Sequence, residues 1–421
     1  MGLSEIYKKS VLEIENVFLR MKNYKYPLLS DAFSNADISA AKKVLVSRQI
    51  TMSKITSNFE KKFAQYLGVK FALMVNSGSS ANLLALSLIC NPQRKKRLLP
   101  GDEVIIPVVC WSTSLWPIVQ HGLVPVFVDV DKNNLNVDIS KLKKAITSKT
   151  KAIMCVHVLG LSANMQEVIN IAKKNNLIII EDTCESFGTR YRGKLLGSFG
   201  EVGTFSFYYS HQITSGEGGM VICKNSEDYE ILHALRSHGW SRHQTTQKKT
   251  MRKYPNLDPR FVFINSGYNL RPTEIQAALA ASQFKRKDIF KINREYNKNK
   301  IINEVYKLKK YTNQIQFLQS EKNIKPSWFG LPILLNYKYK NKKIDYLNYL
   351  TKMGIETRPI ISGNFMNQPA IELYKLNEKK QYFANAQLIE DLGFFIGLHT
   401  KKMTSSLARY LAFHLLKIDE L

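Results

Sequence analysis

Seven short runs of valine, isoleucine and leucine, separated by segments of helical pattern, constrain the fold of this chain most strongly. The runs are FALMV (71–75), DEVIIPVV (102–109), VPVFVDVD (124–131), KAIMCVHVL (151–159), LIIIED (177–182), VGTFSFY (202–208) and GMVIC (219–223). Apolar runs with little polar alternation are typical of parallel strands that are buried on both faces. The sequence therefore predicts one large α/β domain with a mostly parallel seven-stranded sheet covered by helices on both sides.

Helical and strand patterns continue on both sides of this region. The segment TSNFEKKFAQYLGVK places Phe59, Phe63 and Leu67 on one helix face, with Thr56 or Ser57 as the N-cap and a stop at Gly68. After Phe284 follow a long charged helix, the strand-like stretches SWFGLPILL and IETRPI, and a final amphipathic helix. We expect three parts, which are an N-terminal helical segment (1–50), a large α/β domain (51–285) and a small C-terminal α+β domain (286–421).

Charge and cysteine content restrict the partners and the compartment. The 421 residues carry 61 Lys and Arg against 34 Asp and Glu, a net charge of +27. The lysines are spread along the chain without a nucleic-acid-binding motif, so we interpret them as a solvated surface and expect no nucleic-acid partner. Five widely spaced cysteines indicate reduced thiols. With neither a signal-peptide pattern nor a membrane-length apolar run, the sequence predicts a cytoplasmic protein without a membrane partner.

Two polar motifs follow predicted strands, and ligands of parallel sheets bind at the carboxyl ends of the strands. In NSGSSAN, Gly78 and Ser79 open a helix, where free N–H groups and hydroxyls favour a phosphate. For this tripeptide taken alone, an ordinary N-cap is the better explanation. In EDTCES, Asp182 ends a buried strand and needs a cationic partner such as a protonated pyridine nitrogen. Glu185 follows about one turn later. An acidic pair at a helix N-terminus explains these two carboxylates about equally well when the motif is read alone.

Two further residues sit just beyond predicted strands. Trp111 could stack on a flat ring or fill the core. His211 follows the strand that contains Ser206, and no lysine lies between Lys194 and Lys224 in this otherwise lysine-rich chain. A lone histidine is more often structural than catalytic, so only the coincidence of all four motifs at strand ends indicates a site.

Several segments together resemble a known family. FEKKFAQYLGVKFALMVNSGSSANLLAL, PGDEVIIPVVCWST, GLVPVFVDVD, IIIEDTCESFG, GTFSFYY and GEGGMV are similar to the DegT/DnrJ/EryC1/StrS family, which has the pyridoxal-phosphate-dependent aspartate aminotransferase fold, fold type I. In that family the position of His211 holds the lysine that bonds to the cofactor. The stretches YSHQI, RSHGWSR, GYNLRP, SWFG and RPIISGNF resemble the 3-dehydratase branch, in which histidine replaces this lysine.

The resemblance assigns a role to each candidate residue. Because imidazole forms no stable imine, the cofactor is expected to bind non-covalently. The implied cofactor-binding residues are Gly78, Ser79, Trp111, Asp182, Glu185, Ser206 and Asn269. Of these, Asn269 would reach the phosphate in a neighbouring subunit, which implies a homodimer with shared sites. The implied catalytic and substrate-binding residues are His211 as base, Ser210 as its assistant, Arg242 for the sugar nucleotide and Arg358 for the glutamate carboxylate.

The implied reaction is removal of the C3 hydroxyl of a nucleotide-linked 4-keto-6-deoxyhexose by pyridoxamine phosphate, which L-glutamate regenerates from pyridoxal phosphate. GDP is the favoured nucleotide, and the product serves 3,6-dideoxysugar synthesis for surface polysaccharide. The cysteines are too widely spaced for the iron–sulfur cluster of a related dehydrase. Three alternatives stay open: a sugar 4-aminotransferase that uses His211 as base, an inactive cofactor-binding scaffold, and a nucleic-acid-binding protein suggested by the net charge alone.

Overall fold

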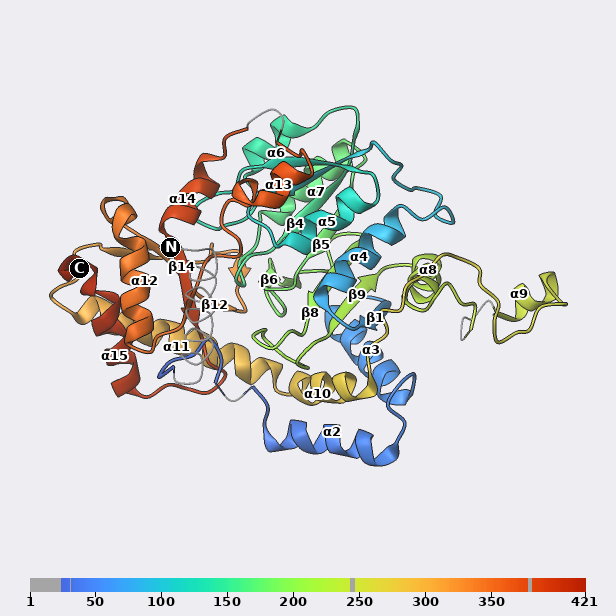
Figure 1. Ribbon diagram of the computed structural model, residues 1–421, viewed down its shortest axis with the longest axis horizontal. Coiled ribbons are helices and arrows are strands. Elements are labelled where there is room, and N and C mark those ends of the chain that lie inside the picture. Colours follow the sequence, from blue (N-terminus) through green and yellow to red (C-terminus); the bar gives the residue numbers. More distant parts are fainter. Residues whose placement is uncertain (1–23, 31, 243–246, 378–380) are drawn as a thin grey trace, which may run out of the picture.

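A seven-stranded sheet forms the centre of the molecule (Figure 1). The computed structural model describes residues 24–421 except 31, 243–246 and 378–380. The strand order is β1-β9-β8-β5-β4-β2-β3, in which β9 runs antiparallel to both of its neighbours and the other pairs are parallel. The strands are β1 (Phe71–Val75), β2 (Glu103–Pro107), β3 (Val124–Val128), β4 (Thr150–Val156), β5 (Ile178–Asp182), β8 (Val202–Ser206) and β9 (Gly219–Cys223). The predicted mostly parallel sheet is confirmed, because each apolar run supplies one strand.

Helices cover both faces of this sheet. Alternate residues of a strand point to opposite faces, so Leu73 packs in one apolar cluster and Met74 in another. One face carries α4 (Gly78–Ile89), α5 (Ser112–Gln120) and α8 (Ser226–Arg236). The opposite face carries α3 (Lys54–Leu67), α6 (Ile139–Ala145), α7 (Met165–Lys174) and α10 (Glu274–Phe284). This double cover buries all five residues of β5, β8 and β9.

The start of α3 differs from the prediction. The helix begins at Lys54 with Ser53 at the N-cap position, instead of a cap at Thr56 or Ser57, while Gly68 ends it as predicted with φ 70°. The buried carboxylate of Glu274 explains the earlier start. It accepts the backbone N–H groups of Ser53 (2.9 Å) and Thr56 (3.1 Å) and the Thr56 hydroxyl (2.6 Å), so a distant side chain supplies the cap.

A smaller antiparallel sheet follows, in the order β10-β12-β14-β13. Its strands are β10 (Ile315–Phe317), β12 (Gly330–Leu335), β13 (Thr357–Arg358) and β14 (Gly393–Gly397). Around it lie α11 (Lys287–Lys307), the long helix that the sequence predicts, and α12 (Lys343–Lys352), α13 (Pro369–Leu373), α14 (Ala384–Leu392) and α15 (Ser405–Leu415). The domain division at residue 285 falls between α10 and α11 and stays a prediction.

The remaining described elements are short. Strands β6 (Arg190–Tyr191), β7 (Lys194–Leu195) and β11 (Ile324–Lys325) form a third sheet, and three 3₁₀ helices cover Tyr337–Lys342, Phe365–Asn367 and Lys417–Glu420. Of the predicted N-terminal segment, residues 1–23 lie outside the described part. The remaining part contains α2 (Asn35–Ser47), which begins with a capping box formed by Ser34 and Asp37. Among the described residues, no helix combines the length and apolarity that crossing a bilayer requires.

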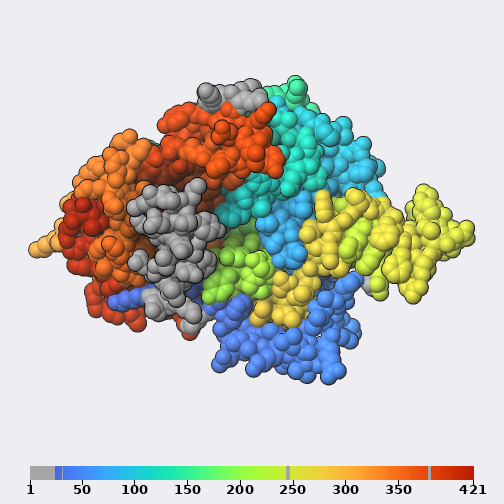
Figure 2. Space-filling view, viewed as in Figure 1, coloured from blue at the N-terminus to red at the C-terminus, as the bar shows by residue number. Residues whose placement is uncertain are grey.

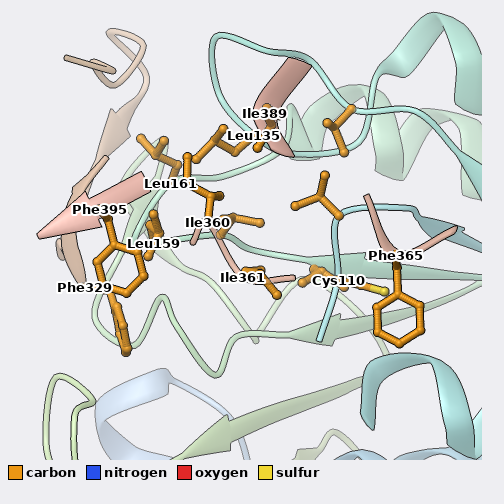
Figure 3. Close-up of a cluster of buried hydrophobic side chains, with 14 of the residues drawn as sticks. Cys110, Leu135, Leu159, Leu161, Phe329, Ile360, Ile361, Phe365, Ile389 and Phe395 are labelled. Atoms are coloured by element: carbon orange, nitrogen blue, oxygen red, sulfur yellow. The ribbon is translucent and has the colours of Figure 1, made fainter. Parts of the chain in front are cut away.

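The C-terminal part is fixed against the carboxyl ends of β2 and β4. The Ser362 hydroxyl donates to the Cys110 carbonyl (2.8 Å), and the Phe329 N–H donates to the Leu159 carbonyl (3.3 Å). Figure 3 shows the apolar side chains at this junction, where Phe329 and Phe395 lie together beside Leu159. The smaller sheet therefore stands next to the edge at which the predicted site residues lie.

A buried ion pair connects α3 with α8 next to β1. Arg236 Nη1 donates to Glu60 Oε1 (2.7 Å) and to the Met74 carbonyl (2.8 Å), and the Met74 N–H donates to the same Glu60 oxygen (2.8 Å). Burial raises the pKa of Glu60 above its ordinary value in spite of the adjacent guanidinium. The carboxylate therefore depends on Arg236 for compensation of its charge.

We predict that Arg236→Met lowers the free energy of unfolding by about 3–5 kcal/mol at pH 8, because it leaves a buried charge unpaired. The loss should be smaller at pH 5, since a carboxyl of raised pKa is protonated more easily there. Urea denaturation at both pH values measures the effect. The double variant Arg236→Met/Glu60→Gln should recover most of the loss, and a double variant no more stable than the single one would contradict this account.

Candidate active site

The predicted residues converge at the carboxyl edge of the large sheet. Gly78 and Ser79 follow β1, Trp111 follows β2, and Asp182 and Ser206 end β5 and β8. Because β1, β2, β5 and β8 point the same way, their carboxyl ends lie along one edge. The motifs, which together span more than a hundred residues of the sequence, therefore lie along one edge of the large sheet.

The start of α4 forms a narrow cradle with the end of β8. A Cβ atom on Gly78 would lie 2.5 Å from Ser206 Cβ and 2.9 Å from Ser206 Oγ, so no larger residue fits without displacement. Ser77 caps the helix through the Ser80 N–H (3.0 Å). The Ser79 hydroxyl lies 3.1 Å from the Thr113 hydroxyl at the start of α5. Two helix N-termini and several hydroxyls thus meet at one place, an arrangement that suits a phosphate.

Asp182 is a buried carboxylate surrounded by neutral donors. The residue is 4% exposed, and its oxygens accept hydrogen bonds from Asn82 Nδ2 (2.8 Å), Ser114 Oγ (2.7 Å) and the Cys184 N–H (3.1 Å). Within the part of the chain that the structure describes, no cationic side chain pairs with it. A buried anion of this kind strongly favours an added cation, and a protonated pyridine nitrogen would supply one.

Glu185 lies close to Asp182 and accepts the Leu159 N–H (3.0 Å). Burial raises the pKa of Glu185 to about 7; the Leu159 hydrogen bond opposes this rise and the negative charge of Asp182 adds to it. The carboxyl is therefore close to half-protonated at neutral pH and can donate as well as accept a hydrogen bond.

His211 stands beyond β8 with its ring between two aromatic side chains. Its ring meets Phe329 edge-on (centroids 5.0 Å apart, 88°) and Tyr208 in the same manner (5.8 Å, 87°). Nδ1 is buried and has no hydrogen-bond partner among the described residues. Burial, followed by the nearby charge of Arg294, lowers the pKa of His211 to about 3. The imidazole is thus uncharged at neutral pH, the form in which it accepts a proton. Ser210, half-buried, directly precedes it.

Three predicted residues lie apart from this cluster. Arg242 and Asn269 are exposed, and Asn269 pairs with Ser237 in an isolated bridge. Arg358 forms an ion pair with Glu356 (2.8 Å) at the edge of the smaller sheet, the surface arrangement that is the simpler explanation for an arginine there. Among the described residues, no hydrogen bond or ion pair joins these three side chains to Asp182 or His211. The basic run on α9 (Gln247–Lys253) extends outward, at the right of Figure 2.

Three members of the cluster are absent from the sequence-based prediction. Asn82, Thr113 and Ser114 lie on α4 and α5 and bind Asp182 or Ser79. Asn82 lies inside the NSGSSAN segment and is one helical turn after Gly78, so helical spacing could have identified it. Thr113 and Ser114 directly follow Trp111 in the sequence, but nothing in the sequence indicates which partner they contact.

The fold and the site define a pyridoxal-phosphate-dependent enzyme of the aspartate aminotransferase fold. The uncompensated Asp182 carboxylate fits the cofactor's pyridine nitrogen, and the cradle at Gly78 and Ser206 fits its phosphate. The model of the DegT/DnrJ/EryC1/StrS aminotransferase family matches residues 32–410. The chain belongs to this family.

Comparison with individual proteins gives more specific matches than the family model does. The chain is 37% identical over 384 residues to a GDP-4-keto-6-deoxy-D-mannose 3-dehydratase of Yersinia pseudotuberculosis, which covers 89% of this chain and 94% of the relative. A solved GDP-4-keto-6-deoxymannose-3-dehydratase variant with bound GDP-perosamine superposes with a TM-score of 0.84 at 34% identity, covering 93% of this chain and 100% of the other. The same enzyme with a trapped PLP-glutamate geminal diamine gives 0.81 at 33% identity, with the same coverage.

We predict that Gly78→Ala weakens binding of pyridoxal phosphate at least about 10-fold, because the new methyl group displaces Ser206 from the start of α4. Titration of the cofactor into the purified protein, followed by absorbance, measures the dissociation constant. Far-UV circular dichroism should stay unchanged. Unaltered binding by Gly78→Ala would contradict the proposed cradle.

Glu185 should make the cofactor-free protein less stable as the pH rises. Its pKa is raised in the folded state, so its contribution is fully present below pH 4.5, the ordinary value, and is lost as the pH rises through about 7. Glu185→Gln removes this titration. The melting temperature of the variant relative to the wild type should therefore increase from pH 5 to pH 8, by roughly 2 °C. A difference that is constant across this range would show that Glu185 does not titrate there.

Proposed function

We propose that this chain is a pyridoxal-phosphate-dependent 3-dehydratase of a nucleotide-linked 4-keto-6-deoxyhexose, with GDP as the favoured nucleotide. The observation that carries the proposal is His211, an uncharged and partly buried imidazole at the position where the family holds its cofactor-bonding lysine. The similarity to relatives named as GDP-4-keto-6-deoxy-D-mannose 3-dehydratases supports the same activity.

The side chains at the sheet edge divide the work of holding the cofactor. We assign its phosphate to Gly78, Ser79 and Ser206, its pyridine nitrogen to Asp182, and its ring substituents to Glu185. Trp111, whose side chain is 57% exposed at this edge, is free to stack on the ring. Bound in its aminated form, the cofactor supplies an electron sink next to C4 of the sugar.

His211 moves the proton that the elimination requires. With the aminated cofactor bound, the neutral ring of His211 would accept the proton from the cofactor's C4′ carbon and return it to the departing C3 hydroxyl, which would leave as water. Ser210, adjacent in the chain, assists. The rings of Phe329 and Tyr208 contact the imidazole edge-on and hold its orientation for this transfer. Overall, the sugar loses one oxygen atom while glutamate becomes 2-oxoglutarate and releases its nitrogen as ammonia.

The remaining assignments concern residues away from the cluster. We assign the diphosphate sugar to Arg242 and the α-carboxylate of glutamate to Arg358, whose side chain is 50% exposed and so can exchange Glu356 for a substrate. We propose a homodimer in which Asn269 reaches the phosphate in the partner's site. The exposed Phe261 (59%) and Phe263 (57%) support a partner surface near Arg242.

We further propose a cytoplasmic enzyme that serves 3,6-dideoxysugar synthesis, of the colitose type, for the O-antigen of lipopolysaccharide. A relative of Salmonella typhimurium that is named as a lipopolysaccharide biosynthesis protein, 36% identical over 369 residues, supports this pathway class. The five free cysteines support a reducing compartment.

The test is incubation of the purified protein with pyridoxal phosphate, glutamate and GDP-, CDP- or dTDP-linked 4-keto-6-deoxyhexoses. We expect ammonia and a 3-deoxy-4-keto product, fastest with the GDP sugar, as identified by mass spectrometry and NMR at C3. His211→Asn should lower ammonia release at least about 100-fold. A stable 4-amino sugar as the main product would instead establish the aminotransferase alternative.

A matched control separates loss of the base from general damage. His414→Asn alters a histidine on α15 that contacts Tyr349 (2.6 Å), away from the sheet edge. This variant should release ammonia at the wild-type rate. Equal losses in the two variants would contradict the assignment of His211 as the base.

A further inference from the structure

Arg294, in the middle of α11, is a buried cation whose role the fold alone does not explain. The residue is 1% exposed, and no carboxylate pairs with it in the part of the chain that the structure describes. Burial lowers the pKa of Arg294 to about 10. A guanidinium that is removed from water without a counter-ion costs free energy, so its presence indicates a specific task.

The guanidinium binds three backbone carbonyls around the proposed base. Nη1 donates to the carbonyls of Trp328 and Phe329 (3.0 Å each), and Nη2 donates to the carbonyl of His211 itself (3.2 Å). Phe329 also supplies the ring that meets the His211 imidazole edge-on. One side chain therefore fixes both the loop that carries the base and the turn that carries its aromatic neighbour.

The neighbouring residue Gln212 holds the same loop from the other side. Its amide nitrogen donates to the carbonyls of Glu185 (2.5 Å) and Ser327 (3.1 Å). Each of these two side chains has one buried atom without a partner among the described residues, the donor Arg294 Nε and the acceptor Gln212 Oε1. Both residues line a cavity of about 10 Å³ between α11 and this loop.

We propose that Arg294 is a positioning residue that, together with Gln212, fixes the loop of His211 for proton transfer. This inference rests on the proposed function only for its catalytic consequence. Arg294 and Gln212 act through His211 and do not touch the substrate.

The first test uses Arg294→Lys, which keeps the charge but cannot reach three carbonyls with one planar group. We expect kcat for ammonia release to fall about 10- to 100-fold, as a displaced base would cause. The KM for the sugar nucleotide and the dissociation constant of pyridoxal phosphate should change less than about 2-fold. Arg286→Lys, the same exchange at an arginine paired with Asp37, should leave all three values unchanged.

The second readout is independent of activity. Histidine labelled with ¹³C at Cε1 gives one NMR signal per ring in the cofactor-free protein, and the signal missing in His211→Asn identifies His211. Arg294→Lys should shift or broaden this signal while the His414 signal stays in place. Gln212→Ala leaves the Arg294 hydrogen bonds intact and should produce a similar shift with a smaller fall in kcat, about 3- to 10-fold.

The kinetic and NMR measurements together distinguish the possible outcomes. An unchanged His211 signal and unchanged kcat in Arg294→Lys overturn the proposal, and so does a parallel loss of kcat, substrate affinity and cofactor affinity, which indicates general structural damage. If Arg294 variants do not fold, Gln212→Ala decides by the same two measurements. If the wild type acts on none of the sugar nucleotides, the proposed function fails while the NMR result still decides whether Arg294 positions His211.

Discussion

The buried carboxylate of Asp182 is the charge on which the arrangement of the site depends. It ends a central strand, where water cannot reach it, and its hydrogen bonds with Asn82 and Ser114 determine how α4 and α5 approach the sheet. The starts of these two helices then bring Ser79 and Thr113 together. The hydrogen bonds of Asp182 thus place both the phosphate cradle and the carboxylate that would bind a protonated pyridine nitrogen. The arrangement of the cofactor site therefore depends on how this one buried carboxylate is hydrogen-bonded.

A second unpaired charge lies on the other side of the proposed base. Arg294 is as buried as Asp182, and it too is satisfied by neutral groups, in this case backbone carbonyls. His211 belongs to the loop that this guanidinium holds, and apolar rings border it. A histidine in such surroundings stays uncharged, because both burial and the adjacent cation disfavour the imidazolium. The residue that replaces the usual lysine is therefore a neutral imidazole.

The sequence predicts the large sheet well because each buried strand is a continuous apolar run, a signal that tertiary contacts do not alter. It predicts the site positions that follow strands for the same reason. It fails where a distant residue decides the local structure. The carboxylate of Glu274 moves the start of α3 to Lys54. Arg294 contacts the carbonyl of His211 across 83 residues, and Gln212 contacts the carbonyl of Ser327 across 115 residues. Each of these contacts depends on one side chain and leaves no periodic pattern in the sequence, so it can be identified only in the folded structure.

The central claim is that His211 leaves the cofactor bound without a covalent link to the protein. Treatment of the purified protein, saturated with pyridoxal phosphate, with sodium borohydride tests it directly, because the reagent makes any cofactor–lysine bond permanent. The account predicts that the intact mass of the polypeptide stays unchanged after removal of free cofactor. A stoichiometric mass increase, mapped by peptide analysis to one lysine, would contradict it.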